Sequence, residues 1–214
     1  MSFLRSSFRL TLFAVLAAVL GTGTLQADSE ACFADRTERR IEACSAVIGT
    51  PGIEAGRLSL AYAMRALAYS LRGEYATSIQ DYDAAIRLNP NFPVALNNRA
   101  WAYFKMGRPA AGLPDVESSI LLDPRSAHSY DTRAHIHQWM GRPGTAILDY
   151  DRAMYFGGER MIKLYQCGLQ NHGLYSGPIN GQSSTELRRA IAACVETTDC
   201  DPLPPDEECR AATS

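Results

Sequence analysis

Four histidines, His128, His135, His137 and His172, are the side chains most suited to metal binding or acid–base catalysis. His128 and His135 are seven residues apart, whereas two histidines that share a metal on one helix are four residues apart. His135 and His137 could chelate an ion together only if the helix unwound between them. No acidic residue has a recognisable ligand spacing to any of the four. We therefore expect no metal site.

Motifs for nucleophilic, metal-dependent or nucleotide-dependent catalysis are also missing from the sequence. It contains no GxSxG, no HExxH and no Walker-type phosphate loop. The formal net charge is -2, so the chain has no excess of basic residues with which to bind nucleic acid. These observations predict a protein without enzymatic activity, without a cofactor and without a nucleic-acid partner.

The first 27 residues have the composition of a secretory signal peptide. Arg5 and Arg9 form a basic start, and residues 10–20 form an apolar run that is short for a bilayer span. Ala27 offers a small residue for cleavage. We expect cleavage near Ala27, export to the periplasm and no membrane span in the mature chain. An uncleaved anchor is the alternative.

Six cysteines flank the middle of the chain: Cys32, Cys44, Cys167, Cys194, Cys200 and Cys209. An even number in an exported protein favours disulfides, and the absence of paired CxxC motifs argues against zinc. We expect Cys32 to pair with Cys44. The other four allow three pairings, of which we favour Cys194–Cys200 with Cys167–Cys209. Free buried thiols are the alternative. A cysteine nucleophile is disfavoured because bridges use all six.

Residues 58–158 repeat themselves with a period of 34 residues. Equivalent positions are Arg65, Arg99 and Arg133; Ala66, Ala100 and Ala134; and Gly73, Gly107 and Gly141. This period, with small, aromatic and proline positions in a fixed order, resembles the tetratricopeptide repeat (TPR) family. The resemblance implies a scaffold of three helical hairpins that binds other proteins. The recurring arginines are expected to support this scaffold rather than to contact a ligand.

We expect an all-α fold, in which a TPR-type helical solenoid of three repeats with an N-terminal capping helix precedes a small disulfide-stapled helical module. The expected segments are a signal peptide at 1–27, a disulfide-bonded cap at 28–57, repeats at 58–90, 93–124 and 127–158, a module at 159–200 and an acidic, proline-rich tail at 201–214. The expected repeat helices are 58–71, 75–88, 93–106, 109–122, 127–140 and 143–156.

Gly112 and Pro114 interrupt the helical pattern of the second repeat. One interpretation is an irregularity that the helix tolerates near its start. The other is that Pro114 bends the helix and reshapes the neighbouring groove.

The resemblance also implies a concave groove lined by the first helix of each repeat. The side chains expected there in repeats two and three are Asn97, Trp101, Phe104, Lys105, Asp131, His135, Gln138 and Trp139. Because Lys105 is nearly alone as a cation, we do not expect capture of a C-terminal carboxylate. The aromatic residues favour an apolar contact, and Asn97 and Gln138 could bond a peptide backbone. The alternative is that the aromatic residues pack against neighbouring helices.

Residues 159–195 resemble the three-helix peptidoglycan-binding module of cell-wall hydrolases. A helix at 161–169, a glycine-rich turn and a last helix from about Ser184 carry this resemblance. The candidate turn residues are Tyr175, Gly177, Pro178, Asn180 and Gly181. Ser183 and Glu186 have capping-box spacing. The sequence departs from the family at Ser184, Leu187 and Cys194, so the fold can be kept while wall binding is lost.

Two functions are compatible with these features. The first is a non-enzymatic periplasmic scaffold that binds a protein or peptide segment of the envelope in the TPR groove. The alternative is a wall-associated factor that docks on peptidoglycan through residues 159–200.

Overall fold

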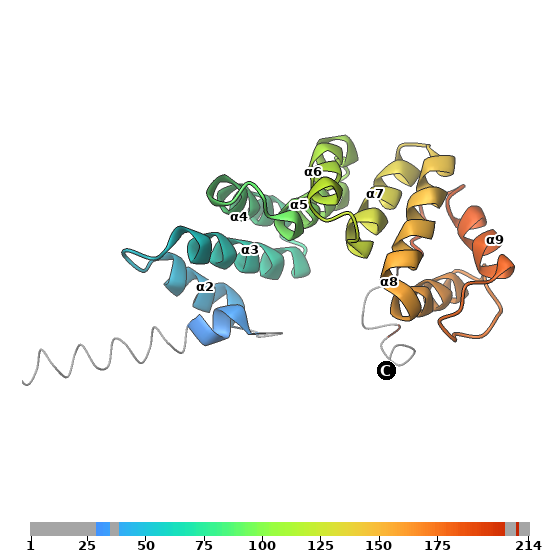
Figure 1. The fold of residues 1–214 in the computed structure, drawn as a ribbon, viewed down its shortest axis with the longest axis horizontal. Coiled ribbons are helices and arrows are strands. Elements are labelled where there is room, and N and C mark those ends of the chain that lie inside the picture. Colours follow the sequence, from blue (N-terminus) through green and yellow to red (C-terminus); the bar gives the residue numbers. More distant parts are fainter. Residues whose placement is uncertain (1–28, 35–38, 204–208, 210–214) are drawn as a thin grey trace, which may run out of the picture. The chain divides into compact units, whose positions relative to one another are not determined.

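The computed structural model describes residues 29–34, 39–203 and 209 (Figure 1). Every regular element in this part of the chain is a helix, which confirms the expected all-α class. The chain divides into two compact units, Met1–Pro90 and Asn91–Ser214. The expected signal peptide at 1–27 and most of the expected tail lie outside the described residues.

The first unit combines a disulfide-bonded cap with one helical hairpin. Its helices are α2 (Arg40–Ile48), α3 (Ala55–Leu71) and α4 (Tyr75–Leu88). Cys32 and Cys44 form a disulfide that ties the short helical stretch 29–33 to α2. Both cysteines lie with Val47 and Ala61 in a small apolar core, so α2 covers the start of the hairpin as expected for a cap.

The helix α3 begins three residues before the expected start at Leu58. The Glu54 carboxylate accepts hydrogen bonds from the backbone N–H groups of Gly56 and Arg57, at 3.0 and 3.3 Å. A side chain at this position satisfies N–H groups that have no partner within the helix. The sequence prediction missed this cap because glutamate is not among the residues preferred there.

The second unit contains two further hairpins and a C-terminal extension. Its helices are α5 (Pro93–Lys105), α6 (Pro109–Leu122), α7 (Ala127–Trp139), α8 (Pro143–Asn171) and α9 (Thr185–Cys194). Left-handed glycines turn the chain inside each hairpin, with φ of 71° at Gly107 and 68° at Gly141, as Gly73 does in the first unit at 76°. Only glycine adopts this conformation without steric cost, so the repeated glycines fix the turns.

Each hairpin is braced by one partly buried ion pair between its two helices. Two hydrogen bonds of 2.7–2.8 Å join each arginine to an aspartate sixteen residues later. The pairs are Arg65–Asp81, Arg99–Asp115 and Arg133–Asp149. The recurring arginines therefore support the scaffold, as the sequence analysis expected. Their partners were missed, although the aspartates recur with the same period of 34.

The helix α6 runs unbroken through Gly112 and Pro114. A Cβ atom added to Gly112 would lie 2.7 Å from the backbone oxygen of Ala100, on α5. The backbones of the two helices of this hairpin therefore approach each other closely at the glycine. Its presence reflects packing between the helices rather than a disturbance of the helix.

Replacing Gly112 by alanine is expected to destabilise the second unit by about 1–2 kcal/mol, because the neighbouring backbone must shift to admit a methyl group. The matched control is Gly144→Ala in α8, where an added Cβ meets no atom within 4 Å. That change is expected to be neutral or to stabilise by up to about 1 kcal/mol. Urea unfolding of the two variants, followed by tryptophan fluorescence, measures the difference. Equal midpoints would contradict the close approach at Gly112.

The segment labelled α8 contains two helices, which meet at Gly158, where the third repeat was expected to end. Gly158 adopts φ 60° and ψ -149°, which is not helical, so the chain kinks at this residue. The apolar core crosses the kink, since Tyr150 before it and Tyr165 and Leu169 after it belong to one cluster. The repeat and the expected module at 159–200 therefore share a core, and the boundary between them stays a prediction.

Candidate functional site

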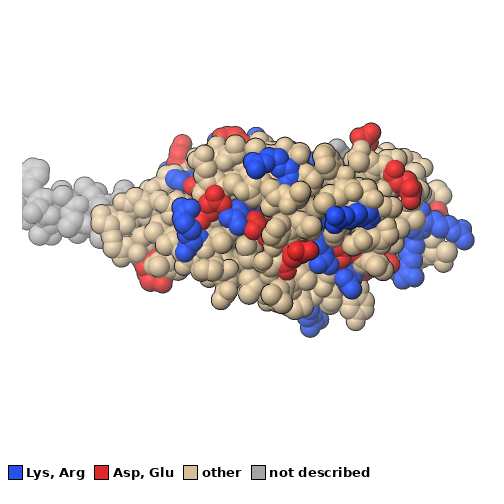
Figure 2. Space-filling view, turned by 90° about the horizontal axis from the view of Figure 1, so that it is seen from above, with Lys and Arg blue, Asp and Glu red and all other residues tan. Residues whose placement is uncertain are grey.

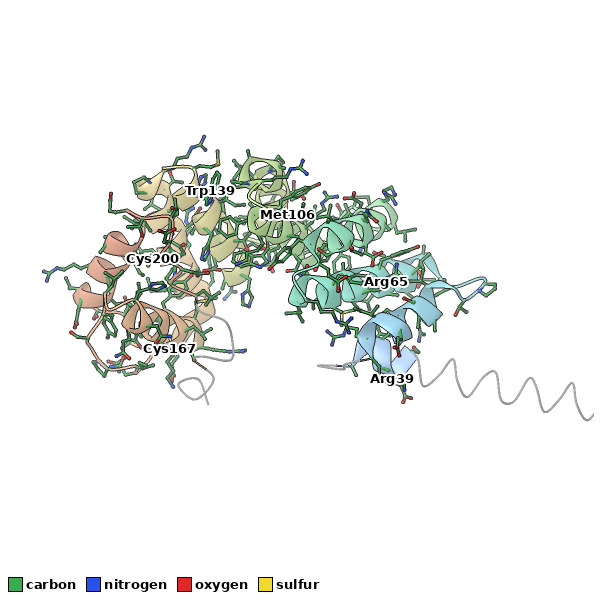
Figure 3. The ribbon with its side chains drawn as sticks, turned by 180° about the vertical axis from the view of Figure 1, so that it is seen from behind. Arg39, Arg65, Met106, Trp139, Cys167 and Cys200 are labelled. Atoms are coloured by element: carbon green, nitrogen blue, oxygen red, sulfur yellow. A yellow bond between two sulfur atoms is a disulfide. The ribbon has the colours of Figure 1, made fainter. Side chains whose placement is uncertain are left out.

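Residues 197–203 lie against the side of α7 that carries His135 and Gln138, and we call this segment the strap. The strap follows α9, and the disulfide Cys194–Cys200 closes a short loop at its start. A second disulfide, Cys167–Cys209, ties the chain beyond the strap to α8. These are the pairings that the sequence favours. Cys200 and Trp139, at the end of α7, are both labelled in Figure 3.

Gln138 of α7 is the main hydrogen-bonding contact to the region of the strap. Its side-chain amide donates to the backbone oxygens of Thr197 and Cys200, at 2.6 and 2.8 Å, and to that of Cys194 at 3.3 Å. Its side-chain oxygen accepts a hydrogen bond from the Tyr150 hydroxyl at 2.8 Å. Because Gln138 is buried, these bonds replace all the water contacts that its amide would otherwise make.

His135 forms the second contact between α7 and the strap. Its Nδ1 lies 2.9 Å from the backbone oxygen of Asp131, and its Nε2 lies 2.8 Å from the carboxylate of Asp201. Since both ring nitrogens face acceptors, the geometry fits a doubly protonated, charged imidazolium. Burial by itself lowers the pKa of His135, but the charges of Asp131 and Asp201 outweigh burial and raise the pKa to about 9.

The two carboxylates beside His135 differ in their surroundings. Asp131 is fully enclosed, and burial raises its pKa, while the Tyr165 hydroxyl donates to it at 2.5 Å. Burial also opposes ionisation of Asp201, but the hydrogen bond and the charge of His135 outweigh it and lower the pKa of Asp201. Asp201 is thus the charged partner that holds the strap on α7.

The chain's own strap takes up the expected groove at His135 and Gln138. These two side chains were expected to face a partner, but they are 3% and 5% exposed and bond the strap. The physical reason is that the strap supplies carbonyl oxygens and a carboxylate at the places where a bound peptide would have supplied them. Asp131 is also 3% exposed, but its carboxylate accepts from Tyr165 of α8, and the residue lines the pocket between α5 and α7.

The remaining groove residues lie at two separate pockets, and strap residues contribute to both. One pocket, of about 180 Å³, is lined by Phe104, Lys105 and Trp139 together with strap residues. The other, of about 340 Å³, lies between α5 and α7 and is lined by Asn97 and Trp101. The two tryptophans thus do not share one binding surface. Trp101 also packs edge-on against the ring of His135, at 5.4 Å between centroids.

The larger of these two pockets carries an unusual polar atom. Asn97 is 8% exposed, and its side-chain oxygen has no hydrogen-bond partner among the described residues. Its side-chain nitrogen donates to the Asn98 side chain at 3.3 Å. An unpaired buried acceptor costs about 1–3 kcal/mol, so an N–H donor that meets this oxygen after a rotation of the Asn97 side chain would be bound favourably.

The residues of this pocket that the sequence analysis missed are Val94, Asn98, Ser126, Thr132 and Leu203. Val94, Asn97, Asn98 and Trp101 have the i, i+3, i+4, i+7 spacing of one helix face. That periodicity could have found Val94 and Asn98. His128, which also lines the pocket, lies on the face of repeat three that was expected to border the groove.

The turn expected to contact peptidoglycan is held together by internal hydrogen bonds. Gln166 of α8 is fully buried, accepts from the N–H groups of Asn180 and Gly181, and donates to the Asn180 side chain. The Tyr175 hydroxyl donates to the backbone oxygen of Pro178, and Gln170 donates to that of Gly177. The five candidate residues therefore build the turn.

The last helix also begins differently from the capping box expected at Ser183 and Glu186. Ser184 caps α9 by accepting a hydrogen bond from the N–H of Leu187 at 3.0 Å. Glu186 instead accepts from the Ser176 hydroxyl in the turn. This contact joins α9 to the turn.

Comparison with known families agrees with the helical hairpins. Residues 66–107 match the TPR repeat family. The matched stretch runs from the middle of α3 through α4 and α5 to the glycine turn that follows. No curated protein matches the chain at a significant level.

TPR repeats typically serve as non-enzymatic scaffolds that bind other proteins, so the match supports a role in protein–protein interaction. Within the described part of the chain, none of the helices has the length and apolar character needed to cross a membrane. Figure 2 shows basic and acidic side chains intermixed on one face of the molecule.

Proposed function

We propose that the protein is a periplasmic scaffold that binds an extended segment of another protein in the pocket between α5 and α7. The basic and apolar leader at 1–27 and the three disulfides support export, because disulfides persist in oxidising compartments. The TPR match supports the scaffold role.

The unpaired side-chain oxygen of Asn97 is the observation that carries this proposal. A peptide in extended conformation presents backbone N–H groups that can donate to such an acceptor. Trp101 lines the same pocket and offers an aromatic surface for a neighbouring side chain. The strap leaves this pocket open while it fills the groove along α7.

A peptide-binding experiment tests the proposal on the full chain without its expected leader. The chain has two tryptophans, so Trp139→Phe leaves Trp101 as the single reporter. Peptides selected on this protein from a random phage library are synthesised and titrated against it. Binding should change the fluorescence of Trp101, and Asn97→Ala should weaken binding about five- to tenfold, the value of one backbone hydrogen bond.

The matched control is Asn91→Ala, which removes an exposed asparagine that does not line the pocket. This variant should bind with unchanged affinity. If the selected peptides bind Asn97→Ala as tightly as the parent, the proposal that they bind in the pocket between α5 and α7 is wrong.

No comparable observation favours docking on peptidoglycan through the turn at 174–181. Its polar groups are used to hold the turn together, and the core it rests on includes repeat three. We therefore place partner binding in the groove.

A further inference from the structure

A second cavity, of about 850 Å³, lies on a different face of α7 from the strap. Tyr130 and Arg133 reach it from α7, whereas Asp131, His135 and Gln138 lie on the side of the strap and the groove pockets, and the centres of the two sets are about 140° apart around the helix axis. None of its lining residues belongs to the groove pockets. Its apolar lining consists of Ile120, Tyr130, Leu148, Met154, Tyr155, Phe156 and Ile162.

Two large apolar side chains at this cavity are left in solvent. Leu148 is 60% exposed and Tyr155 is 80% exposed, and both lie on the same face of α8, two turns apart. Phe156 stacks on Tyr130 at 5.5 Å between ring centroids and packs edge-on against Tyr155 at 5.1 Å. The cavity therefore has an ordered aromatic floor with an unpartnered apolar rim.

Two arginines at the same cavity have weak ionic partners. Arg152 is 54% exposed and lies 3.5 Å from Asp149, a carboxylate that Arg133 already binds through two hydrogen bonds. Arg188 is 66% exposed and lies 3.7 Å from Asp151, which also lines the cavity. A guanidinium group has five N–H donors, so each of these contacts leaves donors for a second carboxylate.

We propose that this cavity is a second interaction surface, which binds an acidic and apolar segment of a partner protein. An apolar side chain of the segment would fill the space between Leu148 and Tyr155, and flanking carboxylates would bind Arg152 and Arg188. The volume lies within the usual range of ligand sites, about 300–1,000 Å³. The two-turn spacing of the apolar side chains fits a peptide segment rather than a small anion. This surface does not depend on the groove function.

The test uses a defined probe, the acetylated and amidated peptide EELFEE, with KKLFKK as its charge-reversed counterpart. The full chain without its expected leader is labelled at isoleucine and leucine methyl groups and titrated by NMR up to about 1 mM peptide, within the range of weak peptide binding. EELFEE should shift the methyl signals of Ile120, Leu148 and Ile162 and leave Ile79 and Leu96 unchanged. KKLFKK should shift none of them.

Matched variants separate this surface from general charge attraction. Arg152→Gln with Arg188→Gln should weaken binding of EELFEE at least tenfold, whereas Arg125→Gln with Arg189→Gln removes the same charge from exposed residues outside the cavity and should leave it unchanged. Tyr155→Ser should weaken binding, and Leu121→Ser, at an equally exposed residue outside the cavity, should not.

Circular dichroism of each variant shows that the helices are retained. Three results would overturn the proposal: no shifts at the cavity methyl groups, equal shifts with KKLFKK, or equal binding by the arginine pair variants. Shifts confined to Leu203, which lines the groove pocket, would overturn it as well, because the peptide would then have bound at the other site.

Discussion

Replacing Arg133 by methionine is expected to destabilise the second unit by about 3 kcal/mol. The change removes both hydrogen bonds to Asp149, whose side chain is 1% exposed and cannot reach water. A buried charge that loses its partner costs about 3–5 kcal/mol. We take the lower end because Arg152 and His137 lie 3.5 and 4.0 Å from the same carboxylate and can compensate in part.

The equivalent change in the preceding hairpin gives the internal comparison. Arg99→Met should cost less, about 1–2 kcal/mol, because Asp115 is 13% exposed and can be partly hydrated. Both hairpins belong to the second unit, which also contains both tryptophans. Urea unfolding followed by tryptophan fluorescence therefore reports on the two variants in the same way.

A double variant tests whether Arg133→Met loses stability because the Asp149 carboxylate stays buried without its ionic partner. Arg133→Met combined with Asp149→Leu should recover most of the stability, since it replaces the ion pair by apolar side chains. Arg125→Met, at an exposed loop residue, should change stability by less than about 0.5 kcal/mol. If the double variant is less stable than Arg133→Met alone, the unpaired, buried charge of Asp149 does not explain the loss of stability.

The features that the sequence predicted well are those encoded within one repeat. The helix bounds of α4 and α6 agree with the expected ranges, and those of α5 and α7 differ by one residue. Local signals determine these bounds. Prolines begin α5, α6 and α8, and glycines with positive φ form the turns within the hairpins.

The occupation of the groove could not be predicted in the same way. The strap contacts join residues that are 59–66 positions apart, and they depend on two backbone carbonyls that have no sequence signature. Gln138 and His135 look like groove residues by position alone. Only the folded chain shows that residues beyond α9 return to bind them.

The end of repeat three was predicted only in part. The kink at Gly158 agrees with the expected end of the repeat helix, since φ of 60° is a conformation that glycine adopts without steric cost. The packing across the kink could not be predicted, because it joins Tyr150 to Tyr165 and Leu169 in one core cluster. Close packing also explains the neighbouring glycine, because an added Cβ at Gly157 would lie 2.5 Å from the Met161 side chain.

Raising the pH from about 6.5 to 9 is expected to lower the stability of the second unit by about 2–3 kcal/mol through His135. The pKa of His135 is about 9 in the folded protein and 6.5 as the reference value for an unperturbed histidine. The folded state therefore holds a proton that the unfolded state releases in this range. The stabilisation is complete below pH 6.5 and is lost as the pH rises through 9.

The size of the effect follows from this difference and from the exposure of Asp201. The difference between the pKa of His135 in the folded protein and its reference value corresponds to about 3 kcal/mol of stability. Asp201 is 39% exposed, so solvent screens its charge and reduces the stability that its ion pair with His135 contributes. Asp201 acts in the opposite direction, because its lowered pKa adds stability above pH 3.8 that is lost on further acidification. Its titration therefore does not overlap the range from 6.5 to 9.

The variant His135→Gln should remove the slope of stability against pH between 6.5 and 9. His137→Gln is the matched control on the same helix, since burial lowers the pKa of His137 and places its titration below 6.5. Urea unfolding midpoints of the three proteins at several pH values in this range measure the slopes. His137→Gln should keep the slope of the parent. If His135→Gln keeps it too, the ionic contact between α7 and the strap does not stabilise the fold as the geometry indicates.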